Sequence, residues 1–255
     1  MINDKTGTFT VDSSGQVEID YLFDGGWFQG ELAVFSLEGM EDFEPGSEAF
    51  IKEAARRALT DSDRGRIIVR DELEGAKFSA DLPWEQDFNT GQYQGVKAFD
   101  LTPGDEVALM LAQNTTVREI GKKPKRISQF GKLPIFSIPE ANFPDYDSSD
   151  GYEVVDVDGN GTIAFEDVPI PQADRDYNDV IINLQGLEGN LPALSDNINT
   201  ARDWRKNSIL FDAGLNPLSD DDLVMHLEFN ETKGKKALDT SPQGGDLAKL
   251  TPGAI

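Results

Sequence analysis

Two clusters of oxygen-bearing side chains lie close together in the sequence, between residues 156 and 179. The first cluster, residues 156–167, has the spacing of a twelve-residue calcium loop, with short oxygen donors at positions 1, 3 and 5 and a glycine at position 6. Calcium takes about 6–8 oxygen ligands, and alternate residues of a tight loop can direct several oxygens towards one centre. The ligands predicted for this first ion are Asp156, Asp158, Asn160, Thr162 through its backbone carbonyl, and Asp167.

The second cluster, residues 174–179, leads directly into an apolar strand, residues 180–184. Carboxylates at the mouth of a buried strand repel one another unless a cation neutralises them. We therefore predict that this cluster binds a second calcium ion. Its ligands are Asp174, Asp176 and Asp179, with Asn178 as a further oxygen donor. Because only six residues separate the clusters, we expect them to lie close together, and Glu166 could belong to either.

Each cluster also has an interpretation without a metal. The first could be an acidic surface turn, rich in Asp and Gly, that binds nothing. The second could be an Asx-rich turn capped by hydrogen bonds. Position 12 is the weakest ligand assignment, because Asp167 is one methylene shorter than the usual glutamate. It could reach the first ion with one oxygen or serve the second ion instead.

The residues on either side of the first cluster exclude an EF-hand, in which two helices flank the loop. Residues 152–155 favour a strand. Pro169 and Pro171 follow the loop, and each lacks the N–H that a continuing helix needs. We therefore expect the calcium loop to lie between strands.

The composition favours divalent cations as partners. The chain has 255 residues with 47 Asp and Glu against 23 Lys and Arg, which gives a net charge of −24. This charge argues against nucleic acid and anionic membranes as partners. The acid is concentrated, since residues 140–179 contain 12 acidic residues and one basic residue. There are no cysteines and one histidine, His226, which excludes disulfides, thiolate metal sites and histidine-rich metal sites.

Hydrophobicity along the chain predicts neither membrane insertion nor a signal peptide. No run of 18 apolar residues exists, so we expect no transmembrane helix. The N-terminus lacks the apolar segment of a signal peptide. We therefore expect either an internal piece of a larger exported protein or an export signal that lies elsewhere.

The pattern of apolar residues predicts an all-β fold. Short strands recur between turns rich in Gly, Pro and Asp, which is typical of an antiparallel β-sandwich of the jelly-roll kind. Strands are predicted near residues 16–23, 31–37, 67–69, 96–101, 107–111 and 180–184. One substantial helix is predicted over residues 47–60, with Ser47 as its N-cap and one apolar stripe. Trp27 could stack on a sugar, although a place at the core or rim of the sheet is the simpler interpretation.

Part of the chain resembles a bacterial domain of unknown function found in large secreted and cell-surface proteins, notably of cyanobacteria. The resemblance rests on Phe-Glu-Asp at residues 165–167, a short spacer, and Asp-x-Asp-Tyr-Asn-Asp before a β-branched strand. It covers roughly residues 8–187 and implies an extracellular β-sandwich with calcium sites, but it does not supply an enzymatic activity. The motif residues that carry over are Glu166, Asp167, Asp174, Asp176, Asn178 and Asp179.

The C-terminal part has a different pattern. Residues 223–245 resemble the opening strands of a laminin-G or concanavalin-A-like lectin domain, with an apolar strand ending in Phe-Asn-Glu and then Asp-Thr-Ser-Pro before glycines. Only the start of such a domain would be present. We therefore predict a sandwich domain over residues 8–187, a linker over 188–218, and either a truncated lectin-like start or a docked tail over 219–255.

These observations lead to three hypotheses about function. The favoured one is a non-catalytic calcium-binding module of an extracellular or cell-surface protein, which acts in adhesion or as a structural spacer. The alternative is a calcium-dependent carbohydrate-binding module, whose sign would be an exposed aromatic residue beside a calcium ion. The least favoured is a glycoside hydrolase with two carboxylates, because the spacing of the acids matches calcium ligands better. Glycans or cell-surface proteins are the partners that these hypotheses imply.

Overall fold

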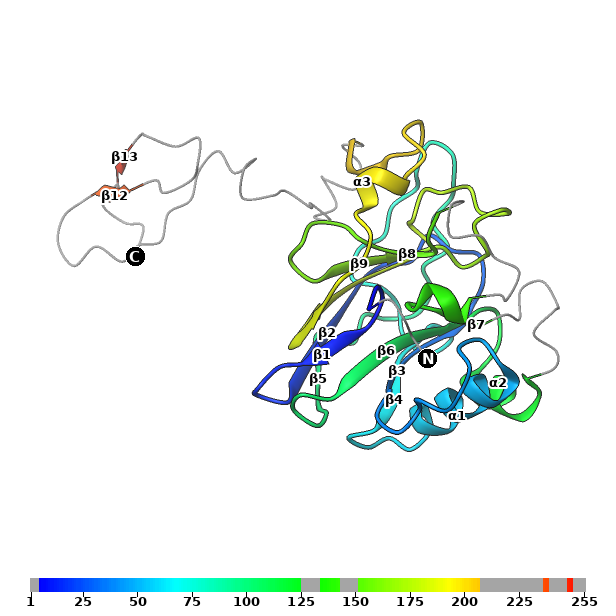
Figure 1. Cartoon of the computed structure of the whole chain (residues 1–255). Helices are drawn as coiled ribbons and strands as arrows, with labels where there is room; N and C mark the ends of the chain where they lie inside the picture. The colour runs from blue at the N-terminus through cyan, green and yellow to red at the C-terminus, as the bar shows by residue number, and fades with distance from the viewer. Residues whose placement is uncertain (1–4, 125–133, 143–150, 207–235, 239–246, 250–255) are drawn as a thin grey trace. The chain divides into compact units, whose positions relative to one another are not determined.

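Strands of alternating apolar residues form two antiparallel sheets (Figure 1). The strands of the first sheet are β1 Phe9–Val11, β3 Glu31–Ser36, β4 Gly65–Arg70, β6 Glu106–Ala112, β7 Pro134–Phe136 and β11 Leu187–Gly189. Those of the second are β2 Gln16–Phe23, β5 Lys97–Asp100, β8 Val154–Asp156, β9 Thr162–Phe165 and β10 Val180–Gln185. The first sheet has the order β11-β1-β6-β3-β4, with β7 also paired to β6, and the second has the order β5-β2-β10-β9-β8. The predicted antiparallel all-β sandwich is confirmed.

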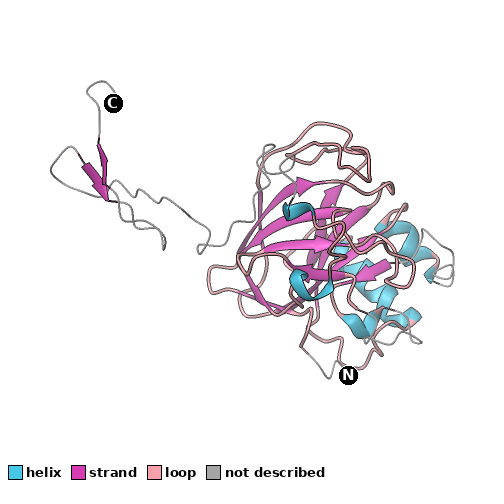
Figure 2. Cartoon of the chain, turned by 90° about the horizontal axis from the view of Figure 1, so that it is seen from above, coloured by secondary structure: helices cyan, strands magenta, loops and turns pink. Residues whose placement is uncertain are grey.

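This computed structural model describes residues 5–124, 134–142, 151–206, 236–238 and 247–249. The chain divides into two units, Met1–Leu215 and Asn216–Ile255. Strands dominate the described part of the first unit, as Figure 2 shows. In the second unit, β12 Lys236–Leu238 and β13 Leu247–Lys249 form an antiparallel pair.

The main core lies between the two sheets, and it follows from the period-two alternation of the strands. On β2, Val17 and Ile19 are fully buried, whereas Glu18 between them is exposed. Leu109 of β6 and Ile182 of β10 belong to the same apolar cluster. Because successive side chains point to opposite faces, every second residue of these strands reaches the space between the sheets.

The predicted helix is confirmed as α1, Glu48–Ala58. Ser47 caps it, because the Ser47 side chain accepts a hydrogen bond from the backbone N–H of Phe50 at 3.1 Å. The apolar stripe of α1, together with the short helix α2 Val117–Lys122, covers the outer face of the first sheet beside β3 and β4 (Figure 1). An amphipathic helix is stable here because its apolar side is buried against the sheet.

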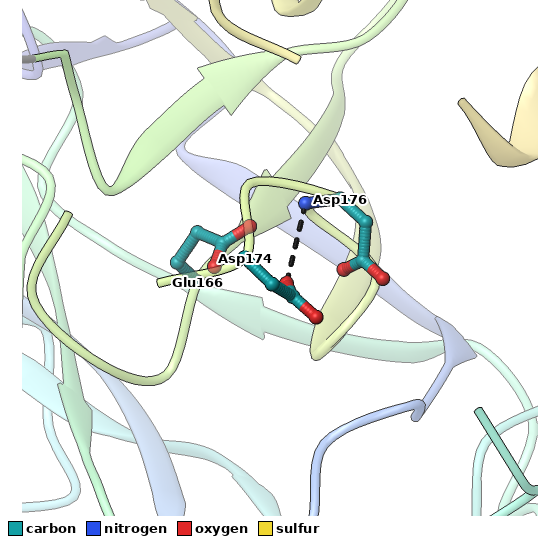
Figure 3. Close-up of side chains that lie close together, drawn as sticks. All are labelled: Glu166, Asp174 and Asp176. Carbon is teal, nitrogen blue, oxygen red and sulfur yellow. Dashed lines mark hydrogen bonds between the residues drawn. The ribbon is translucent and has the colours of Figure 1, made fainter. Parts of the chain in front are cut away.

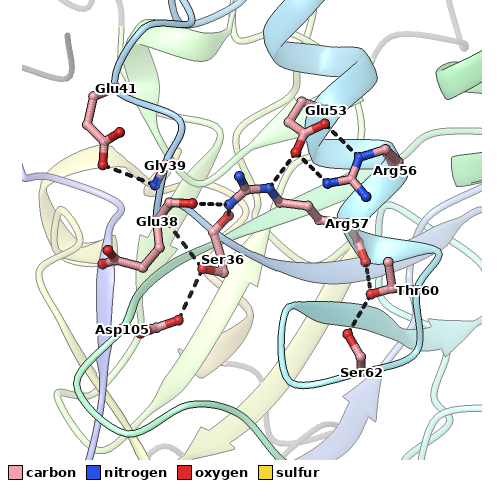
Figure 4. A network of polar contacts seen from close by, with 10 residues as sticks. All are labelled: Ser36, Glu38, Gly39, Glu41, Glu53, Arg56, Arg57, Thr60, Ser62 and Asp105. Carbon is pink, nitrogen blue, oxygen red and sulfur yellow. Dashed lines mark hydrogen bonds and ion pairs between the residues drawn. The ribbon is translucent and has the colours of Figure 1, made fainter.

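A buried arginine fastens α1 to the end of β3 (Figure 4). Arg57 is 3% exposed and donates from Nη1 to the carbonyl oxygens of Ser36 and Glu38, both at 2.7 Å. Its Nε donates to Glu53 at 2.8 Å. The neighbouring Arg56 guanidinium, with help from Arg57, lowers the pKa of Glu53 to about 2. Hydrogen bonds to Glu53 of α1 and to the carbonyls at the end of β3 thus compensate for the burial of the Arg57 charge.

The outer face of the second sheet is covered mainly by loops and short helical turns. Tyr177, Leu194 and Trp204 are fully buried there against apolar residues of β9 and β10. The helical segments near the sheets are α3 Leu194–Asn197, η2 Pro139–Ala141 and η4 Trp204–Lys206. Residues 188–206, predicted to be part of a linker, therefore pack on the sandwich and extend its domain beyond residue 187.

Some predictions fall on parts of the chain that the structure does not describe. The apolar segment 223–232, His226 and most of the lectin-like resemblance lie outside the described residues. None of the helices in the described ranges is long and apolar enough to cross a membrane.

Candidate metal centre

Three loops meet at one end of the sandwich: residues 24–30 between β2 and β3, 71–96 between β4 and β5, and 166–179 between β9 and β10. Backbone hydrogen bonds join the first loop to the third, from Gly25 N to Asn178 O at 3.0 Å and from Gly26 N to Asp179 O at 3.2 Å. A Cβ atom at Gly25 would lie 2.7 Å from Asn178 Oδ1, so a residue with a side chain would not allow this close approach.

Glu166, Asp174 and Asp176 lie together in the third loop (Figure 3). One carboxylate oxygen of each residue lies within 4.8 Å of those of the other two. Two oxygens bound to one calcium ion at about 2.4 Å are at most about 4.8 Å apart. The three oxygens therefore fit the coordination sphere of a single ion.

Few positively charged side chains compensate the negative charge of this cluster. Glu166 is 1% exposed and Asp176 is fully buried. Arg202 forms an ion pair with the exposed Asp174. Among the described residues, no lysine or arginine forms an ion pair with Glu166 or Asp176. Buried carboxylates without a cation are costly unless they are protonated or bind a metal.

The pKa values of the carboxyl groups reflect this burial. Burial, followed by the negative charge of Asp174, raises the pKa of Asp176 to about 7. Burial is also the main cause that raises the pKa of Asp167 to about 7. The pKa values of Glu166 and Asp179 lie well above their usual range, because of burial and then neighbouring charges. Burial thus disfavours the charged form of each of these carboxyl groups.

The backbone of the loop is strained where it presents these acids. Arg175 and Tyr177 have φ angles of 60° and 54°, a left-handed conformation that is uncommon for residues with side chains. Tyr177 is fully buried, its N–H donates to Glu166 Oε1 at 2.7 Å, and its hydroxyl donates to the carbonyl of Tyr152 at 2.6 Å. Such strain costs about 1–3 kcal/mol per residue and persists only where the surroundings enforce it.

Asn178 adds an oxygen that lacks a donor. Its Nδ2 donates to Glu85 Oε2 at 2.9 Å and to Asp176 Oδ2 at 3.0 Å. Its Oδ1 is buried and has no hydrogen-bond partner among the residues that the structure describes. A buried amide oxygen left without a donor is unusual, and it is also the kind of oxygen that calcium binds.

Two residues of the centre, Trp84 and Glu85, were not predicted from the sequence. Trp84 Nε1 donates to Asp176 Oδ2 at 2.8 Å. Glu85 is half-buried and accepts from Asn178, and burial is the main cause that raises its pKa. Both lie in the second loop, about 90 residues from the motif, in a stretch whose turn-rich pattern gives no sign of a site. Only the fold brings them to the cluster.

A second pair of carboxylates adjoins the centre. Asp24 and Asp71 are both buried, and their carboxyl groups interact with each other. Burial, with the charge of Asp71, raises the pKa of Asp24 to about 8, and burial raises that of Asp71 to about 6. Asp71 and Asp167 line one small cavity of about 20 Å³ together with Tyr21. The acidic region thus extends from the third loop to the first two.

The first predicted calcium loop is a hairpin turn between β8 and β9. Asp156 Oδ1 accepts a hydrogen bond from the N–H of Asp158 at 3.1 Å. Asp158 accepts from the N–H of Asn160 and the hydroxyl of Thr162, each at 2.8 Å. The carbonyl of Thr162, predicted as a ligand, accepts from Val157 N at 2.9 Å. These are the hydrogen bonds of an Asx-rich turn, and metal binding at this turn stays a prediction.

The structure places Asp167 with the second cluster and away from the first. The strand β9, four residues long, separates it from the hairpin turn, and this strand alone spans about 13 Å. The N–H of Asp167 donates to Asp179 Oδ2 at 2.7 Å. Of the ten predicted ligands, the structure thus brings together Glu166, Asp167, Asp174, Asp176, Asn178 and Asp179 at one end of β9. It places Asp156, Asp158, Asn160 and Thr162 at the other.

Comparison with known families adds one match. Residues 101–187 match a family described as a domain of unknown function, DUF4114. The matched residues include both oxygen-rich clusters and the strands around them, from β6 to β10. No curated protein and no solved structure shows a significant match to the chain.

Proposed function

We propose that this chain is a non-catalytic calcium-binding module of an extracellular or cell-surface protein, stabilised by its metal and acting in adhesion or as a structural spacer. The observation that carries the proposal is the centre of Glu166, Asp174 and Asp176, whose oxygens lie within 4.8 Å of one another. The carboxylate of Glu85 lies beside the same residues, because Asn178 Nδ2 donates to both Glu85 and Asp176.

The donor set favours calcium over other common ions. The donors are carboxylate and amide oxygens, which suit hard cations, and the chain has no cysteine for a zinc-thiolate site. Magnesium prefers near-octahedral geometry and keeps several of its waters. A centre with many protein oxygens, most of them buried, is therefore better suited to calcium.

Burial argues for a structural role of these carboxylates. A glycoside hydrolase needs its two carboxylates on either side of the sugar, in a site that the sugar can enter. Glu166 and Asp176 are at most 1% exposed, so a sugar could not reach them in this structure. We therefore propose that the acids bind the ion and perform no hydrolysis.

The proposed ion would connect parts of the chain that are far apart in sequence. Its ligands in the third loop contact Trp84 and Glu85 of the second, and backbone hydrogen bonds hold the first loop against the same residues. An ion that binds only the folded chain adds about 2.7 kcal/mol of stability at a concentration one hundred times its Kd. Calcium would thus make this end of the sandwich rigid.

The resemblance to domains of large secreted bacterial proteins supports the extracellular setting. Its motif residues form the centre, and the chain needs no disulfide if calcium provides the cross-link. The lectin-like pattern near the C-terminus supports a place in a multidomain surface protein. The extracellular setting and the place in a multidomain protein are both part of what we propose.

Calorimetric titration of calcium into the chelator-treated chain tests the proposal. We expect calcium to bind, magnesium to bind at least tenfold more weakly, and Asp176→Asn to abolish the calcium step at this centre. Asp42→Asn is the matched control, because it removes the same charge from an exposed site. Absence of calcium binding in the unmodified chain would refute the proposal. So would equal binding by Asp176→Asn and Asp42→Asn.

A further inference from the structure

An exposed tryptophan stands beside the proposed calcium centre. Trp27 is 74% exposed, and its ring stacks against Phe28 with a centroid distance of 6.0 Å and an interplanar angle of 24°. Single exposed apolar side chains are common on protein surfaces. A tryptophan this exposed nevertheless presents a large, flat apolar face that a ligand can cover.

The backbone on both sides of Trp27 is fixed to the acidic centre. Gly26 donates to the carbonyl of Asp179 at 3.2 Å. The N–H of Phe28 forms a hydrogen bond with the carboxylate of Asp167. The indole is therefore carried by a loop whose neighbouring residues are held in place by the centre. Because the loop is already held in place, less of its conformational entropy is lost when a ligand binds to the indole.

The same loop continues into a polar groove. The groove has a volume of about 290 Å³. Its polar side chains are Gln29, Glu31, Arg70, Glu72, Asn114, Thr115 and Thr116, of which Glu31 and Arg70 form an ion pair. Gln29 is two residues from Trp27 and donates to Thr90 at 3.3 Å. Amide, hydroxyl and charged groups thus gather next to the loop that carries the exposed indole.

We propose that Trp27 and this groove bind a neutral glycan. The assignment of calcium dependence rests on the function proposed above, because the centre holds the loop. A pyranose ring has an apolar C–H face, which suits an indole, and hydroxyl groups, which need donors and acceptors such as those of the groove. The net charge of −24 disfavours acidic glycans, nucleic acids and anionic lipid surfaces.

Affinity electrophoresis in native gels that contain neutral polysaccharides tests this proposal. The probes are a β-glucan, a xylan, a mannan and a galactan, each in calcium and in chelator. We expect at least one of them to retard the calcium-loaded chain. We expect Trp27→Ala to weaken that retardation at least about tenfold in affinity, and Val96→Ala to leave it unchanged. Val96 is the control because it is another exposed apolar residue, at 56%.

The outcomes separate this proposal from the calcium proposal. Retardation that is lost in Trp27→Ala and in chelator supports the glycan site. Equal retardation of the unmodified chain and Trp27→Ala overturns it. Calcium calorimetry of the same preparations distinguishes the two failures. A chain that binds calcium and no polysaccharide overturns the glycan site alone. A chain that binds no calcium yet shows Trp27-dependent retardation overturns the calcium proposal and supports the glycan site.

Discussion

The indole N–H of Trp84 donates a hydrogen bond to Oδ2 of Asp176 at 2.8 Å, although the two residues are 92 positions apart in the sequence. Asp176 is fully buried at the centre of the acidic cluster. The hydrogen bond therefore links the long loop between β4 and β5 to the carboxylates of the loop between β9 and β10. It also places a fluorescent side chain directly against the proposed ligands.

Tryptophan fluorescence is therefore expected to report calcium binding. Calcium would withdraw electron density from the Asp176 carboxylate and change the environment of the Trp84 indole. We expect a saturable change in emission during a calcium titration, and we expect Trp84→Phe to remove most of it. Trp27→Phe is the control, because its side chain is mainly in solvent and the signal should persist. If Trp27→Phe alone removed the signal, Trp84 would not be the residue that reports calcium binding.

Substitutions in the two clusters are expected to affect different binding steps. Asp158 lies in the hairpin turn and Asp176 in the buried cluster, at opposite ends of β9. Asp176→Asn should abolish one calorimetric calcium step, and Asp158→Asn should weaken another at least tenfold. If the same single step is lost in both variants, the two-ion prediction is wrong. If Asp158→Asn changes nothing, the hairpin is an Asx-rich turn without a metal.

The stability of the metal-free chain is expected to fall as the pH rises. The pKa is about 6 for Asp71 and about 7 for Asp167 and Asp176 in the folded chain, above the ordinary value of 3.8. The folded state therefore binds more protons than the unfolded state between about pH 4 and 7, and raising the pH through this window destabilises it. We expect a lower melting temperature in chelator at pH 8 than at pH 5.

Calcium should reverse this pH dependence, since it replaces the protons at the centre. The gain in melting temperature from calcium should accordingly be larger at pH 8 than at pH 5. Melting curves at both pH values, with calcium and with chelator, check the sign. A metal-free chain that is more stable at pH 8 would show that these carboxylates are not buried as described.

The buried Arg57 is expected to matter far more for stability than its exposed neighbour. Arg57→Met would leave the buried carbonyl of Ser36 without this donor and would leave Glu53 with Arg56 alone, at a cost of about 2–4 kcal/mol. Arg56→Met removes an ion pair with Glu53 in which the arginine is mainly exposed, and Arg57 still donates to Glu53, so the cost should be less than about 1 kcal/mol. Urea denaturation in saturating calcium measures both. Similar costs for the two variants would contradict the role of Arg57.

Local patterns were sufficient to predict the longer elements of the fold, whereas short ones such as β1, β9 and α2 were not predicted. The alternation of residues 16–23 predicts β2, and Ser47 with its apolar stripe predicts α1, because these signals depend only on nearby residues. Phe165 and Tyr177 beside the acidic motif are both fully buried. The extent of the domain was not predictable. Trp204 packs on the sandwich through contacts that its polar neighbours in sequence do not indicate.

The candidate centre was predictable only in part. The motif at residues 174–179 identifies the cluster, but its partners Trp84 and Glu85 come from another loop and carry no local signal. Counting positions also assigned Asp167 to the first loop. Counting loop positions assumes that residues 156–167 form one continuous loop. Residues 162–165 instead form the strand β9, so Asp167 lies beside the second cluster.

The melting temperature of the chain with and without calcium tests the central claim most directly. If the buried carboxylates of the centre bind calcium in the folded state alone, saturating calcium should raise the melting temperature by about 5–10 °C over chelator, and magnesium should restore little of the gain. The chelated and calcium-loaded samples should be compared at pH 8, where protons compete least. Superimposable melting curves in chelator and in millimolar calcium would contradict the account.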